Sequence, residues 1–103
     1  MNILFVCSRN QWRSPTAEAI FKDHALYVAR SAGTSDKARV KISLKLLEWA
    51  DQVFVMEKRH KEILLSRFDM EKKIIVLNIP DEYQYMDSDL VKMIKDSVGP
   101  WLK

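Results

Sequence analysis

The chain has 103 residues, 48% of them hydrophobic and 30% charged, and carries a net charge of +3. This composition is typical of a globular protein, and the length predicts one domain that spans residues 1–103, with no room for a second. No apolar run approaches the roughly 18 residues that span a membrane, so a membrane protein or a membrane partner is not expected.

The N-terminal residues 1–6 are mostly apolar, but they lack the basic region of a signal peptide, and the polar residues 8–10 follow almost at once. Cys7 is the single cysteine, so no internal disulfide can form, which indicates a reducing compartment. We therefore expect a cytoplasmic protein. The mild positive charge indicates either a solvated surface or an attraction for anionic substrates, nucleic acid included.

Predicted strands and helices alternate along the chain. The apolar run 3–6 is typical of a buried parallel strand, and Ser14-Pro15 predicts a helix with Ser14 as its N-cap and Pro15 at its first position. Further strands are predicted at 26–31, 52–56 and 74–77, and further helices at 43–50, 59–68 and 88–98. This order predicts an α/β fold: a three-layer sandwich with a central four-stranded parallel sheet and a phosphate-binding loop after the first strand.

Cys7 follows the first predicted strand directly, at the edge of the sheet where ligands of open parallel sheets bind. Five residues separate Cys7 from Arg13, and the predicted helix begins just beyond. That spacing allows the loop backbone to wrap around a tetrahedral oxyanion such as inorganic phosphate, with its N–H groups pointing inward. Arg13 can hold two of the oxygens in a bidentate pair.

The helix N-terminus and Arg13 also favour the thiolate form of Cys7, which makes the sulfur a nucleophile for phosphorus. Ser14 is placed to donate a hydrogen bond to that thiolate and to stabilise it as a leaving group. The alternative interpretation is that Cys7 is an inert core thiol, a common role of free cysteines.

Residues 6–21 read VCSRNQWRSPTAEAIF, which resembles the signature V-C-x-G-N-x-C-R-S-P-x-A-E of the low-molecular-weight protein tyrosine phosphatases. The resemblance continues through residues 31–34, through 53–57, and at Asp81-Glu82-Tyr83, where that family has Asp-Pro-Tyr. It implies that Asp81 is the general acid that protonates the leaving oxygen. It also implies that Asn10 braces the loop in a left-handed backbone conformation and that Tyr83 flanks the substrate.

The sequence departs from the family at three places. Arg9 replaces a glycine, and it either adds charge at the rim of the cleft or points to solvent. Trp12 replaces a second cysteine, so the protective disulfide of many relatives is absent and Cys7 is open to irreversible oxidation; the indole either lines the cleft or caps the first helix. The segment 34–42 is shorter than in typical members. With Ser8 and Gln11, Arg9 and Trp12 are the predicted substrate-binding residues of the loop.

The resemblance implies a metal-independent hydrolase of phosphorylated proteins, with phosphotyrosine as the first candidate and no cofactor. Ser8 and Gln11 agree better with a related phosphatase for phosphoserine in the RNA polymerase II tail, and a nucleotide, RNA or small phosphomonoester stays open. A phosphocysteine carrier and a non-catalytic phosphate-binding module are the alternative functions. His24 and His60 lack the spacing of metal ligands, and His24 is predicted to be a core histidine on the apolar face of the first helix.

Overall fold

The computed structural model describes residues 1–70 and 72–102. The four strands are β1 (Asn2–Cys7), β2 (Val28–Gly33), β3 (Gln52–Val55) and β4 (Ile74–Val76). The helices are α1 (Arg13–Phe21), α2 (Leu44–Trp49), α3 (Lys58–Arg67) and α4 (Ser88–Val98), followed by the short 3₁₀ turn η1 (Gly99–Trp101).

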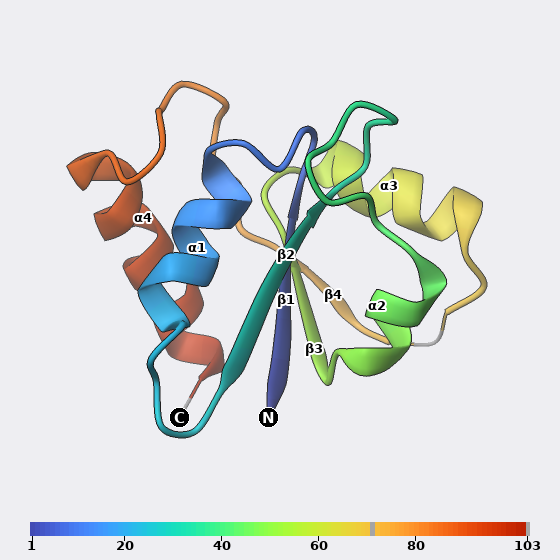
Figure 1. Cartoon of the computed structure of the whole chain (residues 1–103), viewed down its shortest axis with the longest axis horizontal. Coiled ribbons are helices and arrows are strands. Elements are labelled where there is room, and N and C mark those ends of the chain that lie inside the picture. The colour runs from blue at the N-terminus through green and yellow to red at the C-terminus, as the bar shows by residue number, and fades with distance from the viewer. Residues whose placement is uncertain (71, 103) are drawn as a thin grey trace.

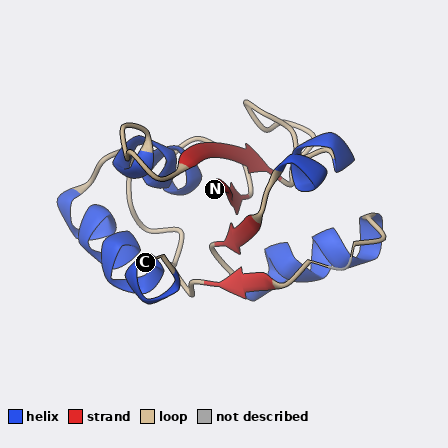
Figure 2. Cartoon of the chain, turned by 90° about the horizontal axis from the view of Figure 1, so that it is seen from below, coloured by secondary structure: helices blue, strands red, loops and turns tan. Residues whose placement is uncertain are grey.

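All strand pairs are parallel, and the strands lie in the order β2-β1-β3-β4. The helices α1 and α4 cover one face of the sheet, and α2 and α3 cover the other (Figures 1 and 2). The predicted three-layer α/β sandwich with a four-stranded parallel sheet is therefore confirmed.

The alternation of side chains along β1 builds both halves of the core. Ile3 and Phe5 point into the cluster under α1 and α4, whereas Leu4 and Val6 point into the cluster under α2 and α3. All four side chains are fully buried, as expected for a central parallel strand that is covered on both faces. The buried strand leaves Cys7, at its end, fixed in position.

The chain reverses direction across the sheet at β1, because β2 lies on one side of β1 and β3 lies on the other. Ligands of open α/β sheets bind at such a switch point, beyond the carboxyl ends of the strands. The loops after β1, β2, β3 and β4 all meet at this end of the sheet, the upper end in Figure 1.

The predicted start of α1 was wrong by two residues. The helix begins at Arg13 with Trp12 as its N-cap, and no side chain caps its first turn. Ser14 is therefore the second residue of the helix rather than its N-cap. Its hydroxyl does not cap the helix but is hydrogen-bonded to Cys7 and Asn10 of the loop. Pro15 is still tolerated, since the first-turn N–H groups of a helix have no partner within it.

The other predicted bounds differ from the observed ones by one or two residues at most, and α4 was predicted correctly. The largest shift is in β2, which runs from Val28 to Gly33 rather than over 26–31. Pairing with β1 sets this register, because Asn2 lies opposite Val28 and Cys7 lies opposite Gly33.

The prediction of a core histidine at position 24 was wrong. Because α1 ends at Phe21, His24 lies in the following turn and is exposed. Its Nδ1 accepts a hydrogen bond from the Leu26 N–H at 3.1 Å, and its ring packs against Tyr27.

Within residues 1–70 and 72–102, no helix has the length and apolar character needed to cross a membrane.

Candidate active site

A pocket of about 250 Å³ opens at the carboxyl end of β1. Its lining comes from the loop between β1 and α1 and from the loop after β4. The lining residues are Cys7, Ser8, Arg9, Gln11, Trp12, Arg13 and Asp81. All seven belong to the set of site residues predicted from the sequence, and the fold brings them together.

The backbone of the loop 7–14 is supported from outside by the segment that follows β2. The bonds run from the N–H groups of Thr34, Ser35 and Arg39 to the carbonyl oxygens of Cys7, Ser8 and Arg9, at 3.0, 2.9 and 3.0 Å. These carbonyl groups are thus engaged on the outer side of the loop. Such an arrangement suits a loop whose own N–H groups face a bound anion.

Gly33 allows the close approach of these two segments. A Cβ atom at this position would lie 2.4 Å from the Ser8 carbonyl oxygen, 2.7 Å from the Ala38 Cβ and 3.0 Å from the Asn10 nitrogen. Real Cβ atoms do not come so near to backbone, so the absence of a side chain at Gly33 is required for the position of the loop.

Asn10 holds the turn of the loop. Its φ of 56° places it in the left-handed region, which asparagine adopts more readily than most residues. Its buried Nδ2 donates hydrogen bonds to the Ser14 and Ser31 hydroxyls at 2.8 and 2.9 Å. The predicted left-handed conformation and bracing contacts of Asn10 are confirmed.

Ser14 contacts the thiol directly, with 2.9 Å between the Ser14 Oγ and the Cys7 Sγ. The Ser14 oxygen accepts the Asn10 amide hydrogen, and its own hydrogen can be donated to the Cys7 sulfur at 2.9 Å or to the more distant Ala32 carbonyl oxygen at 3.4 Å. A donor in this position stabilises a thiolate more than a thiol. Asn10, Ser14 and Cys7 therefore form one hydrogen-bonded chain beneath the pocket.

Arg13 is almost fully buried and is held by groups from two other loops. Its Nη1 donates to the Glu57 carboxylate at 2.5 Å and to the Ile79 carbonyl oxygen at 2.8 Å. Its Nε lies 3.7 Å from the Asp81 carboxylate. A buried guanidinium needs such partners, and here they also fix its orientation at the pocket.

Glu57 lies between two arginines, since Arg59 donates to the same carboxylate oxygen that pairs with Arg13. Partial burial raises the pKa of Glu57, but the hydrogen bonds and charges of Arg59 and Arg13 together lower this pKa below 4.5. Glu57 is thus a stable carboxylate at neutral pH and a constant partner for Arg13.

Asp81 stands on the opposite wall, and its side chain is 53% exposed. The loop that carries it is anchored on both sides. The buried Ile79 donates its N–H to the Met56 carbonyl oxygen at 2.8 Å, and the Met86 N–H donates to the Thr16 hydroxyl at 2.9 Å. The carboxylate is therefore held near the pocket while remaining open to solvent.

Two residues at the rim had open alternatives. Trp12 is 44% exposed and lines the pocket, and it also occupies the N-cap position of α1 without a side-chain capping bond. Arg9 is exposed and also lines the pocket, so it adds charge to the rim. Tyr83 lies elsewhere: it is half-buried and packs against the core cluster under α1 and α4.

Sequence reasoning missed Glu57 and His60, which lie directly behind the pocket. Their side chains form the capping box of α3, in which each bonds the backbone N–H of the other. His60 is fully buried and also lies 2.9 Å from the Ser8 hydroxyl. The sequence signal was the spacing of the two residues after β3, which fits a capping box, although histidine is unusual in that role.

In the part of the chain that the structure describes, no three His, Cys, Asp or Glu side chains form a group that could hold a metal ion.

A parallel sheet that carries a Cys-x₅-Arg loop at its switch point, with an aspartate facing the arginine, defines the class of cysteine-based phosphatase folds.

Comparison with known proteins agrees with this class. The family model for low molecular weight phosphotyrosine protein phosphatase matches residues 2–43. A protein-arginine-phosphatase of Bacillus subtilis is 35% identical over an alignment 95 residues long, and the match covers 66% of this chain and 63% of that protein. The chain thus spans less than two thirds of the length of this curated relative.

Solved structures extend the likeness to the whole fold. A mutant of YwlE from Bacillus subtilis has a TM-score of 0.76 at 25% identity, covering 100% of this chain and 99% of that one. A YwlE arginine phosphatase with its active-site cysteine replaced by a phosphorylated serine scores 0.76 at 25% identity, covering 99% and 95%. A low molecular weight protein tyrosine phosphatase from T. tengcongensis scores 0.74 at 26% identity, covering 96% and 93%. Residues 2–43 thus match the low molecular weight phosphotyrosine protein phosphatase family, and the whole chain is similar to solved structures of such phosphatases.

Proposed function

We propose that the protein is a cysteine-dependent phosphomonoester hydrolase that acts through a phosphocysteine intermediate on Cys7. One observation carries the proposal: a nucleophile, a cationic clamp and a carboxyl group, from Cys7, Arg13 and Asp81, converge on a single pocket. Each of these groups meets a separate need of phosphoryl transfer, and a protein that merely binds phosphate needs neither a thiolate nor an acid.

In the first step, the Cys7 thiolate attacks phosphorus while Arg13 and the loop N–H groups bind the phosphoryl oxygens. The bond from phosphorus to the leaving oxygen breaks, and protonated Asp81 gives that oxygen its proton. In the second step, Asp81 removes a proton from water as the water attacks phosphorus. The phosphorus–sulfur bond then breaks, and the thiolate leaves with the Ser14 hydrogen bond in place.

We take phosphotyrosine in a protein as the first candidate substrate. The exposed Trp12 side chain at the rim offers a flat aromatic surface to a planar leaving group such as a phenol ring. This wall favours phosphotyrosine over phosphoserine, nucleotides or RNA, which present no such ring next to the phosphate.

Phosphoarginine is the second candidate, because the 35% identical relative is a protein-arginine-phosphatase. A guanidinium group is also planar and cationic, so it can stack on the Trp12 indole. The chemistry would differ in one respect: a phosphorus–nitrogen bond would break, and Asp81 would protonate nitrogen.

The first test is hydrolysis of p-nitrophenyl phosphate in the presence of EDTA by the wild type, Cys7→Ser and Asp81→Ala. We expect metal-independent turnover that Cys7→Ser abolishes and Asp81→Ala lowers by about tenfold, because p-nitrophenolate leaves readily without a proton. Phosphotyrosyl, phosphoarginyl and phosphoseryl peptides of one sequence then rank the substrates.

A folded wild type that hydrolyses none of these compounds would contradict the proposal. Isolation of a stable phosphocysteine on Cys7 would then indicate a carrier, and phosphate binding without any covalent product would indicate a binding module.

A further inference from the structure

His60 lies behind the wall of the pocket and connects it to the start of α3. Its side chain is fully buried. One ring nitrogen, Nε2, lies 2.9 Å from the Ser8 hydroxyl, and the other, Nδ1, lies 3.1 Å from the Glu57 backbone nitrogen. Ser8 itself lines the pocket with Cys7 and Arg13. The imidazole is therefore the link between a helix cap and a pocket side chain.

The two contacts fix which nitrogen carries the proton. The Glu57 backbone N–H can only donate, so Nδ1 must accept and carries no hydrogen. In the neutral ring the proton is then on Nε2, which donates to the Ser8 oxygen. Burial, followed by the charges of Arg13 and Arg59, lowers the pKa of His60 to about 4, against the opposing charges of Glu57 and Asp81. The ring is thus neutral at the pH of the cell.

This arrangement excludes a serine nucleophile of the Ser-His type. A histidine that activates serine accepts the hydroxyl proton at Nε2, whereas here Nε2 already carries a hydrogen. The Ser8 oxygen instead accepts from His60 and keeps its own hydrogen for donation. With one side of the hydroxyl engaged by the buried ring, that hydrogen is directed away from His60.

We propose that His60 is a positioning residue that holds Ser8 so that its hydroxyl donates a hydrogen bond to a phosphoryl oxygen in the pocket. The inference rests on the proposed function in that it assumes a tetrahedral oxyanion in the loop 7–14. It adds a neutral donor beside the charged clamp of Arg13, and it assigns a purpose to a histidine at a position where a capping box ordinarily has glutamate or glutamine.

The test is calorimetric titration with sodium tungstate, a tetrahedral dianion, of the wild type, Ser8→Ala, His60→Asn and the double variant. The side-chain oxygen of asparagine can still accept the Glu57 N–H, but the shorter side chain cannot reach the Ser8 hydroxyl. His60→Asn therefore keeps the helix cap and loses the contact with Ser8. We expect Ser8→Ala to weaken tungstate binding about tenfold and His60→Asn to weaken it roughly fivefold. The double variant should match Ser8→Ala alone, because His60 acts through Ser8.

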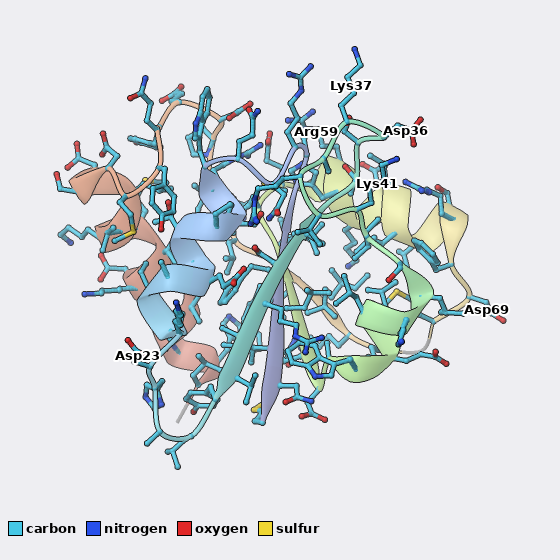
Figure 3. All side chains as sticks on the ribbon, viewed as in Figure 1. Asp23, Asp36, Lys37, Lys41, Arg59 and Asp69 are labelled. Atoms are coloured by element: carbon cyan, nitrogen blue, oxygen red, sulfur yellow. The ribbon has the colours of Figure 1, made fainter. Side chains whose placement is uncertain are left out.

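His60→Gln provides the rescue. Its longer amide can accept the Glu57 N–H and still present an N–H to Ser8, so tungstate affinity should return to within about twofold of the wild type. His24→Asn is the matched control: it changes the other histidine, which also accepts a backbone N–H. His24 follows Asp23, which lies at the end of the molecule opposite Lys37 and Arg59 (Figure 3). Arg59 pairs with Glu57 behind the pocket, so His24 is remote from the pocket, and His24→Asn should leave tungstate binding unchanged.

Multiplicative losses in the double variant, or no rescue by His60→Gln, would overturn the inference and leave His60 as a helix cap alone. Unchanged binding in Ser8→Ala would overturn it as well, as would a wild type that binds no tungstate. Because tungstate binding requires no turnover, this experiment decides the role of His60 even if the protein hydrolyses no phosphomonoester.

Discussion

The two walls of the pocket are built in different ways. On the side of the loop 7–14, Asn10, Arg13 and Ser14 are buried, and each makes hydrogen bonds to other elements. On the other side, Asp81 is 53% exposed, and its contact with Arg13 is an ion pair at 3.7 Å. Groups that bind the phosphoryl oxygens benefit from being fixed before the substrate arrives, whereas a group that exchanges protons with leaving group and water needs access to both.

The same contrast separates stability from activity. A change in the buried wall removes groups that hold the fold together, so it should affect both properties. A change at Asp81 should affect activity alone, because an exposed ion pair contributes little to stability.

The largest effect is expected from Arg13→Lys. Lysine keeps the charge but cannot reproduce the fork that contacts Glu57 and Ile79 and that would bind phosphate in the proposed function. We expect kcat/KM for p-nitrophenyl phosphate to fall about 10³-fold and the free energy of unfolding to fall by roughly 2 kcal/mol. Kinetics and urea denaturation measure the two. A fall in activity with unchanged stability would show that the buried contacts of Arg13 do not support the fold.

Next is Asp81→Asn on the exposed wall. Loss of the acid should lower kcat about 10²-fold for a phosphotyrosyl peptide, and less for p-nitrophenyl phosphate, whose leaving group needs a proton less. The urea denaturation midpoint should stay the same as in the wild type. Equal losses for both substrates would argue against proton donation by Asp81.

Gly33→Ala tests whether the segment after β2 supports the loop. The new Cβ would lie 2.4 Å from the Ser8 carbonyl oxygen, so the loop must move. A displacement of about 1 Å in a catalytic group can cost about 10²-fold, and Tm should also fall. Gly99→Ala is the control, because no atom lies within 4 Å of its added Cβ. Equal behaviour of the two variants would contradict the tight approach at Gly33.

A last prediction concerns stability alone: a pH dependence of the free energy of unfolding that arises at His60. Its pKa is about 4 in the folded protein and 6.5 ordinarily, so below pH 6.5 the unfolded chain binds more protons. The free energy of unfolding should therefore fall as the pH is lowered from 7 to 4, by roughly 3 kcal/mol in total from this group. Urea denaturation of the wild type and His60→Asn isolates this contribution, and identical pH profiles would contradict it.

Most of the fold could be predicted from the sequence, because short apolar runs and helix signals set β1, β3, β4 and α4 locally. The pocket-lining residues were predictable for a similar reason, since the loop after β1 is continuous in sequence. Asp81 could be placed from the resemblance and from its position after a strand. These features depend on local order and on the rule that parallel strands end at the same edge.

What failed depended on contacts between distant segments. Ser14 was assigned both to a helix cap and to a contact with the Cys7 thiol, and the contact is observed but the cap is not. His60 and Glu57 act through the Ser8 hydroxyl and the Arg13 guanidinium, which lie more than 40 residues away in the sequence. No local pattern reports on such pairs, and a histidine in place of glutamate in a capping box conceals the cap itself.

The three backbone bonds from the segment after β2 to the loop 7–14 have a consequence for hydrogen exchange. The amide hydrogens of Thr34, Ser35 and Arg39 are donated to the carbonyl oxygens of Cys7, Ser8 and Arg9 in the pocket loop. Although Arg39 itself is a surface residue, its amide can exchange only when the two segments separate, so all three should exchange at one shared rate. An oxyanion that holds the loop closed should slow all three together, which makes these amides reporters of pocket occupancy, although none of the three residues lines that pocket.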